Sequence, residues 1–152
     1  MPPERMQRQI ALLQRLHGQE CTFTGSVDGK SLVLDFGARH PTGIDEARGL
    51  VAAFEGDYWL VVQCPWRLDS STDVIVGGFD SVELILDFSR ILVGKRVRAT
   101  QVDPPGFTAQ LSFDDDLTLW LFPCDSTELL ADDDADGTAP PWVISGRAIA
   151  DG

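Results

Sequence analysis

Two segments of the chain carry apolar residues at the spacing of an amphipathic helix. In residues 4–16 the apolar positions recur every three or four residues and so share one side. These positions are Met6, Ile10, Leu13 and Leu16. The second segment follows Asp80 and Ser81, either of which can cap a helix. Its apolar positions are Val82, Ile85, Leu86, Phe88 and Leu92. Both segments run into a glycine, which is typical of a helix C-terminus, so we expect two helices.

The remaining apolar runs predict strands joined by short turns. Four runs are expected to form two hairpins, 21–25 with 31–36 and 96–102 with 108–113. The first hairpin turns at Asp28-Gly29, and the second at a proline- and glycine-rich tetrapeptide. Trp-bearing apolar runs follow at 58–62 and 117–122, and further apolar runs end in glycine at 74–77 and 143–146. The strands are therefore expected to be mostly antiparallel.

Three short segments allow more than one interpretation. Residues 82–86 also fit a strand, because the run is short and contains β-branched residues. Residues 41–54 fit either a short helix capped by Thr42, which we favour, or a strand at 50–54 that pairs with 58–62. Residues 132–137 match the opening of a calcium-binding loop. Since Val143 stands where such loops need a glutamate, we expect a solvated loop and no metal site.

The order of predicted elements occurs twice along the chain. Gly18 and Gly94 each follow a predicted helix, and Phe36 and Phe113 each precede a turn that leads to a Trp-bearing strand. We expect an α+β fold of two tandem helix-plus-antiparallel-meander repeats, at about 4–77 and 80–149. The repeats would pack with pseudo-twofold symmetry around one core, giving about eight strands in a single domain, 1–152.

Charge is concentrated in the last third of the chain. The chain of 152 residues has a formal net charge of −12, and residues 103–152 hold eleven acidic side chains and one basic side chain, Arg147. Such a surface repels nucleic acid and anionic membrane and attracts basic partners. We find no apolar run long enough to span a membrane and no signal-peptide pattern, so we expect a cytoplasmic protein. The three cysteines, at 21, 64 and 124, are expected to be reduced core thiols because their number is odd and their spacing wide.

The sequence Cys64-Pro65-Trp66-Arg67 is the main candidate for a binding site. Pro65 cannot donate to a sheet ladder, so the strand before it is expected to reach an edge or a bulge. Trp66 would then supply flat contact area and Arg67 a bidentate donor for a carboxylate or phosphate. We add Trp59 and Asp80 to this predicted site. The alternative is that Trp66 closes the end of the core, with Arg67 stacked over it or paired with Asp69 or Asp80.

The run at 58–68, which ends in this sequence, resembles a bacterial family of small acidic proteins of unknown function. These proteins share a strand ending in Cys-Pro-Trp-Arg and a later glycine-containing strand, which here is Val74-Ile75-Val76-Gly77-Gly78 followed by Asp80. The resemblance covers the middle third of the chain and, more loosely, 113–121. It implies no activity. By type rather than by motif, small acidic bacterial domains include immunity proteins that neutralise toxins.

Catalytic signatures are few. The chain has only two histidines, His17 and His40, and lacks a phosphate-binding loop, a nucleophile elbow and zinc-ligand spacing. We expect no enzyme, no catalytic residue and no cofactor. The function predicted first is an acidic protein-binding module, with the toxin-neutralising type as its specific form. We expect a basic protein as partner and no nucleic-acid or membrane partner, and a homodimer is compatible with the sequence. The alternative is a small-molecule-binding domain with an aromatic and arginine pocket between the repeats, walled by Trp59, Trp66, Trp120 and Trp142.

Overall fold

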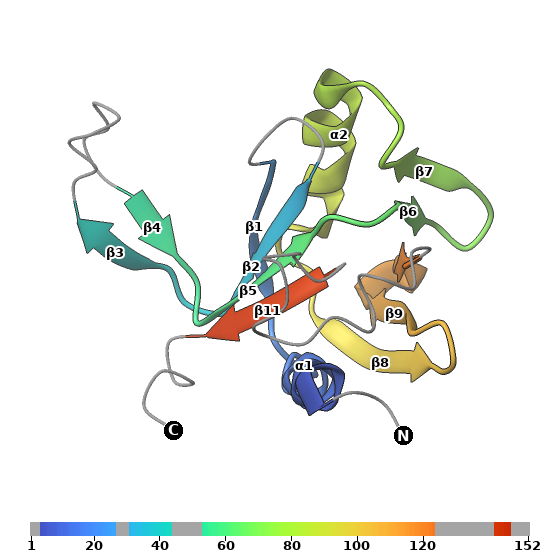
Figure 1. The fold of residues 1–152 in the computed structure, drawn as a ribbon. Coiled ribbons are helices and arrows are strands. Elements are labelled where there is room, and N and C mark those ends of the chain that lie inside the picture. Colours follow the sequence, from blue (N-terminus) through green and yellow to red (C-terminus); the bar gives the residue numbers. More distant parts are fainter. Residues whose placement is uncertain (1–3, 27–30, 44–52, 124–141, 147–152) are drawn as a thin grey trace.

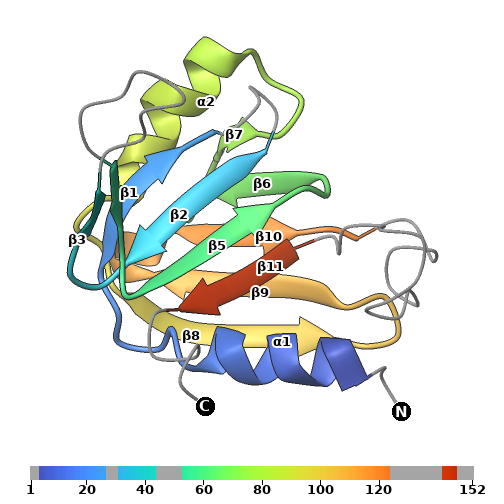
Figure 2. The same cartoon turned by 60° about the vertical axis from the view of Figure 1, so that its left-hand side comes forward.

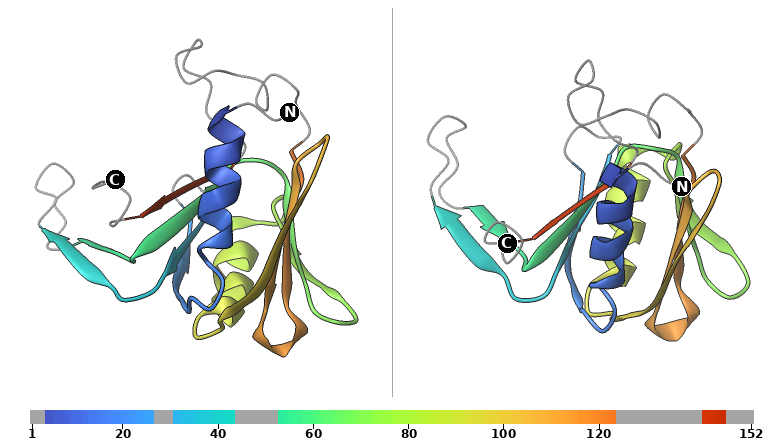
Figure 3. Two further views of the ribbon diagram at one scale, coloured as in Figure 1. Left: turned by 90° about the horizontal axis from the view of Figure 1, so that it is seen from below. Right: turned by 60° about the horizontal axis from the view of Figure 1, so that its bottom comes forward.

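The computed structural model describes residues 4–26, 31–43, 53–123 and 142–146. Two antiparallel sheets face each other, and both helices lie between them at opposite ends of the interior (Figures 1 and 3). The helices are α1 (Glu4–Gln14) and α2 (Val82–Ser89), and α2 continues into a 3-10 turn, η2 (Arg90–Leu92). A second 3-10 turn, η3 (Asp114–Asp116), joins two strands. The helical spacing of apolar residues therefore predicted both helices, and α2 is not a strand.

The four-stranded sheet has the order β1-β2-β5-β11. Its strands are Cys21–Gly25, Leu32–Phe36, Tyr58–Val62 and Trp142–Gly146. The five-stranded sheet has the order β7-β6-β10-β9-β8. Its strands, in that order, are Val74–Gly77, Trp66–Asp69, Thr118–Leu121, Thr108–Phe113 and Val97–Asp103. A small hairpin of β3 (His40–Gly43) and β4 (Ala53–Glu55) projects from the first sheet (Figure 1).

The two halves of the chain exchange strands between the sheets. The strand β6 follows β5 almost directly, yet it pairs with β10 in the other sheet, while β11 returns to pair with β5. The crossing occurs at Pro65, whose carbonyl accepts a hydrogen bond from Phe122 N at 2.8 Å. The proline thus stands where one sheet ends and the other begins, because it cannot donate to either ladder.

This exchange shows that the predicted fold class is wrong. The described part is mostly strand, at 47% strand and 23% helix, and its two helices do not each head a separate meander. Neither half forms a self-contained sheet, since β6 and β7 complete the sheet of β8 to β10 and β11 completes that of β1, β2 and β5. The apolar faces are covered by the opposite sheet rather than by one helix per unit, because a single helix is too narrow to cover four strands.

The core lies between the two sheets. Alternate strand residues point inward, and Leu60, Val62, Leu119 and Leu121 are fully buried, as their spacing predicted. The rings of Phe36 and Phe113 stack across the core, with centroids 6.4 Å apart and planes 15° from parallel. Each helix adds its apolar side to this core, and the buried apolar residues are Met6 and Leu13 in α1, Ile85 in α2 and Leu92 in η2.

Helices also protect the open sides of the sandwich. The helix α1 packs against the edge strands β8 and β11, and Gln9 Oε1 accepts the backbone N–H of Ile144 at 2.7 Å. The helix α2 packs against β7 and β1, the edge strands on the other side (Figure 2). Ser81 caps α2 by accepting a hydrogen bond from Leu84 N at 3.4 Å. Unpaired strand edges invite association with other chains, so these contacts leave fewer edges open.

The sheets are joined at the ends of β1 and β8, where the two predicted helix-stop glycines lie. Gly18 N donates to Val97 O and Gly94 N donates to Cys21 O, both at 2.8 Å. Gly18 and Gly94 have φ angles of 82° and 90°, which L residues with a side chain rarely adopt. The glycines thus allow each helix to end and the chain to enter its sheet within a few residues.

The segment 41–54 and several predicted loops lie partly or wholly outside the described residues. The alternative strand at 50–54 pairing with 58–62 is wrong, because β4 pairs with β3 and β5 pairs with β2 and β11. The favoured helix in 41–54 falls mainly outside the described residues, as do the turn at 27–30, Cys124 and the acidic loop at 132–137. Neither described helix is long and apolar enough to cross a membrane.

Candidate functional site

The four residues predicted to form one binding site are divided among three places. Trp66 and Asp80 line the same cleft, at the end of α2 that carries Ser81. Arg67 lies on the outer face of the five-stranded sheet, because neighbouring residues of a strand point to opposite faces. Trp59 pairs with Asp35 and Ser145 on the outer face of the four-stranded sheet. Only the pair of Trp66 and Asp80 therefore belongs to one site.

The cleft lies where the chain crosses between the sheets and has a volume of about 420 Å³. Its lining residues are Gln63, Cys64, Pro65, Trp66, Gly78, Phe79 and Asp80. Trp66 is only 4% exposed and forms the buried part of the lining. Its indole N–H has no hydrogen-bond acceptor among the described residues. The alternative interpretation of Trp66, as a residue that closes the core, is confirmed, and its edge also borders the cleft.

Gly78 allows the indole of Trp66 to lie against the backbone. Gly78 N donates to Trp66 O at 3.0 Å, which continues the pairing of β6 and β7 past the end of β7. A Cβ atom at position 78 would lie 2.9 Å from both Cδ1 and Nε1 of Trp66. Real Cβ atoms do not approach a rigid, buried ring so closely, so the position requires glycine.

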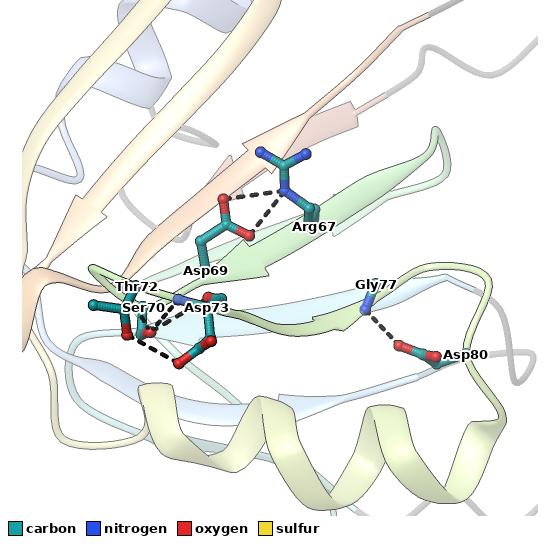
Figure 4. A network of polar contacts seen from close by, with 7 residues as sticks. All are labelled: Arg67, Asp69, Ser70, Thr72, Asp73, Gly77 and Asp80. Atoms are coloured by element: carbon teal, nitrogen blue, oxygen red, sulfur yellow. Dashed lines mark hydrogen bonds and ion pairs between the residues drawn. The ribbon is translucent and has the colours of Figure 1, made fainter.

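The rim of the cleft combines an exposed aromatic ring with a fixed carboxylate. Phe79 is 92% exposed, although burying a phenylalanine side chain is worth roughly 1.5–3 kcal/mol. Asp80 Oδ2 accepts the backbone N–H of Gly77 at 2.8 Å, which holds the carboxylate beside the cleft (Figure 4). The rim therefore presents an apolar contact and a negative charge side by side.

The apolar surface continues along α2 and η2. The helix buries only one narrow line, Ile85, Ser89 and Leu92, and apolar residues occupy both flanks of that line. On one flank Leu84, Phe88 and Ile91 follow each other at intervals of four and three residues, and we call these three residues the α2 stripe. The exposed apolar residues of this segment are 36–47% exposed: Val82, Leu84, Leu86, Phe88, Ile91 and Val93. A helix with so wide an apolar arc is usually covered on more than one side.

Arg67 is paired with Asp69, as the alternative to a free recognition residue predicted, but it is stacked over Trp120 and Phe122 rather than over Trp66. Its Nε donates to both carboxylate oxygens of Asp69, at 2.8 and 3.0 Å (Figure 4). Its guanidinium carbon lies 5.9 Å from the ring centroid of Trp120 and 5.5 Å from that of Phe122. An aromatic and arginine cluster therefore exists, but on the outer face of a sheet. Trp142 is fully buried in the core, so the four tryptophans do not wall one pocket.

The two described cysteines are buried, and His40 lies against a carboxylate. Burial raises the pKa of the Cys21 thiol to about 12, so this thiol stays protonated at neutral pH. Cys64 is also buried, and both thiols are reduced, as predicted. His40 Nε2 lies 2.6 Å from Asp57 Oδ1 beside the β3–β4 hairpin. Within the described ranges, no group of three or more His, Cys, Asp or Glu residues is placed to hold a metal ion.

Sequence reasoning did not find the α2 stripe. The signal was present, since eight of the twelve residues from Val82 to Val93 are apolar, more than the single buried line of an ordinary surface helix needs. Comparison of the chain with protein-family models, curated proteins and solved structures finds no match in any of the three. The resemblance through Cys-Pro-Trp-Arg therefore stays a prediction.

Proposed function

We propose that the protein is an acidic protein-binding module that holds a basic protein partner against the α2 stripe and the neighbouring cleft. The observation that carries this proposal is the concentration of exposed apolar side chains on one segment. Seven of the ten large apolar residues exposed in the described part lie between Phe79 and Val93. Contiguous apolar patches with polar rims mark interaction surfaces in proteins of this size.

The charge around this patch supports a basic partner. Residues 79–93, which carry the patch, contain three acidic side chains, Asp80, Glu83 and Asp87, and one basic side chain, Arg90. The patch therefore has an acidic excess beside its two apolar flanks, and the whole chain has a net charge of −12. A partner with apolar anchors surrounded by lysine or arginine complements this pattern, whereas an acidic partner would be repelled.

This proposal gives the cleft a specific role. Interfaces draw most of their affinity from a few aromatic, aliphatic or arginine side chains that fill pockets. The cleft of about 420 Å³ between Trp66 and Phe79 offers such a pocket, with the Asp80 carboxylate at its rim. Neutralisation of a basic toxin by covering its functional surface is the form of this function suggested by analogy with small acidic immunity proteins, and a cytoplasmic location stays part of the prediction.

A capture experiment with matched variants tests the proposed function. The full-length protein, immobilised, is exposed to source-cell lysate at low and high salt, in parallel with Phe88→Ser and Phe54→Ser variants. Phe88 and Phe54 have similar exposure, 47% and 51%, but Phe54 lies on β4, away from α2. We expect a basic protein that is captured by the parent and by Phe54→Ser, lost with Phe88→Ser, and weakened at high salt because ions screen exposed charges beyond roughly 8–10 Å.

Three results would contradict the proposal. The first is a captured protein that is acidic or insensitive to salt. The second is equal loss of capture in both variants, which would indicate a nonspecific effect on exposed aromatic residues. The third is self-association of the parent chain in light scattering that Phe88→Ser abolishes, because α2 would then be covered by a second copy rather than by a basic protein.

A further inference from the structure

The outer face of the five-stranded sheet is mainly polar and carries one pair of aromatic rings, Trp120 and Phe122, with Val74, 61% exposed, opposite Asp69. Leu68, Leu111 and Leu119 point into the core, so the residues between them point outward. Strand register places the outward residues in two rows across β6, β10 and β9. One row is Asp69, Thr118 and Ser112, and the other is Arg67, Trp120 and Gln110. Both described helices lie on the inner side of this sheet (Figure 3).

A shallow cavity of about 530 Å³ lies over part of this face. Trp120 is its aromatic wall, and hydroxyl groups of Ser70, Ser112 and Thr118 contribute to its polar lining. The carboxylates of Asp69 and Asp116 border it. The volume lies within the range of small-molecule sites, roughly 300–1,000 Å³. The cavity thus offers one flat apolar wall and several hydrogen-bonding groups, most of which both donate and accept.

The aromatic wall is held in position by its neighbours. The rings of Trp120 and Phe122 lie 3° from parallel with centroids 6.2 Å apart. Arg67 lies over both rings, and its own orientation is fixed through the two hydrogen bonds from Nε to Asp69 (Figure 4). A wall that is fixed before binding does not lose side-chain freedom when a ligand arrives, which favours affinity.

The charge of the site disfavours an anionic ligand. Arg67 is paired with Asp69, and Arg98, which also lines the cavity, is paired with Asp114. An anion would meet the carboxylate of Asp116, which borders the cavity, and the field of a chain with net charge −12. A neutral ring with many hydroxyl groups meets no such repulsion. Its C–H face can lie on Trp120 while its hydroxyls donate to the carboxylates and accept from serine, threonine and arginine.

We propose that this face carries a binding site for a neutral saccharide ring, with Trp120 as the stacking surface and Ser112, Thr118 and Asp69 as hydrogen-bonding groups. Arg67 positions the aromatic wall. This site lies on a different sheet face from the α2 stripe and does not depend on the proposed function.

Nuclear magnetic resonance titration of the full-length protein tests this proposal. The probes are glucose, galactose, mannose and N-acetylglucosamine with their β-linked disaccharides, and galacturonate and benzoate are the charged comparisons. We expect saturable shifts of the Trp120 indole N–H signal and of backbone amides of β6, β9 and β10 with at least one neutral sugar. Trp120→Leu should weaken binding at least about tenfold, equivalent to roughly 1.4 kcal/mol. Trp59→Leu, a half-buried tryptophan on the outer face of the other sheet, should leave it unchanged.

Thermal melts show whether each variant is folded. A second test is Thr118→Val, which removes the hydroxyl group of Thr118 and keeps nearly the same side-chain shape. We expect Thr118→Val to weaken sugar binding without shifting the melting temperature by more than a few degrees. Absence of shifts with every neutral sugar would overturn the proposal. Shifts confined to elements other than β6, β9 and β10 would also overturn it. Stronger binding of galacturonate or benzoate, removed by Arg67→Gln, would identify an anion site instead.

Discussion

Replacement of Gly78 by alanine tests the packing on which the cleft depends. The new Cβ would lie 2.9 Å from Cδ1 and Nε1 of Trp66, inside the contact distance of about 3.5–4.0 Å. The indole cannot swing away, because Trp66 is rigid and almost completely buried. Overpacking of this kind costs about 1–3 kcal/mol of unfolding free energy. For a chain of this length each kcal/mol corresponds to about 2–4 °C in melting temperature.

Urea unfolding followed by tryptophan fluorescence measures this loss. The matched control is Gly106→Ala, because a Cβ at Gly106 meets no atom within 4 Å and its backbone is not strained. We expect that variant to stay within about 1 kcal/mol of the parent. A Gly78→Ala protein as stable as Gly106→Ala would refute the reasoning.

A double-mutant cycle identifies Trp66 as the cause of the loss. Trp66→Leu destabilises the chain by itself, since it removes a large buried ring. In the Trp66→Leu background, however, Gly78→Ala should cost at least about 0.5 kcal/mol less than in the parent. Additive effects of the two substitutions would show that Gly78 is needed for backbone conformation and not for contact with the indole.

Two further predictions concern the four-stranded sheet and the exchanged strands. Burial raises the pKa of Asp35 above its ordinary value of 3.8, so the folded state takes up a proton more readily than the unfolded state and gains stability as pH falls from neutral through the folded-state pKa. Asp35→Asn should therefore be more stable than the parent at neutral pH, with an advantage that shrinks toward acid pH in urea titrations; an advantage independent of pH would contradict this. A fragment of residues 1–78 should fail to unfold cooperatively in circular dichroism melts, because β6 and β7 would lack their partner β10; a cooperative, monomeric fragment would show that the exchange is dispensable.

Local features of the fold could be predicted from the sequence. The three- and four-residue spacing of apolar positions predicted both helices, and Ser81 was named among the caps of α2. The hairpin of β8 and β9 followed from two apolar runs around a turn sequence. Inward burial of Leu60 and Leu119 followed from strand alternation. Each of these features depends on residues close together in the chain, where geometry leaves few alternatives.

The assignment of strands to sheets could not be predicted in the same way. Nothing in the residues of β6 distinguishes pairing with β5, its neighbour in sequence, from pairing with β10. The pairing of β6 depends on which arrangement of strands covers both apolar sheet faces. That depends on the whole chain and not on β6 alone. Pro65 showed that a ladder must end, but not where the chain would go next.

The candidate site was predicted in part. Trp66 and Asp80 were named together and do line one cleft. Arg67 was placed beside Trp66 although strand alternation sends adjacent side chains to opposite faces, so this part of the prediction could have been rejected from the sequence. The α2 stripe required tertiary structure, because exposure of Phe88 depends on how little of α2 the edge strands cover.

The exchange of strands between the sheets has a consequence for synthesis of the chain. The inner strand β5 has β11 as one of its two neighbours, with Trp142 facing Val62, so the four-stranded sheet cannot be completed until β11 has been made. Likewise β6 cannot form its pairing with β10 until residues 118–121 have been made. Pairings between residues so distant in sequence slow folding, because the entropy of closing a long loop is lost before the contacts form. A chain emerging from the ribosome would therefore have an open edge on β5 until β11 is made and on β6 until β10 is made, and chaperones that shield such edges should increase the yield of native protein.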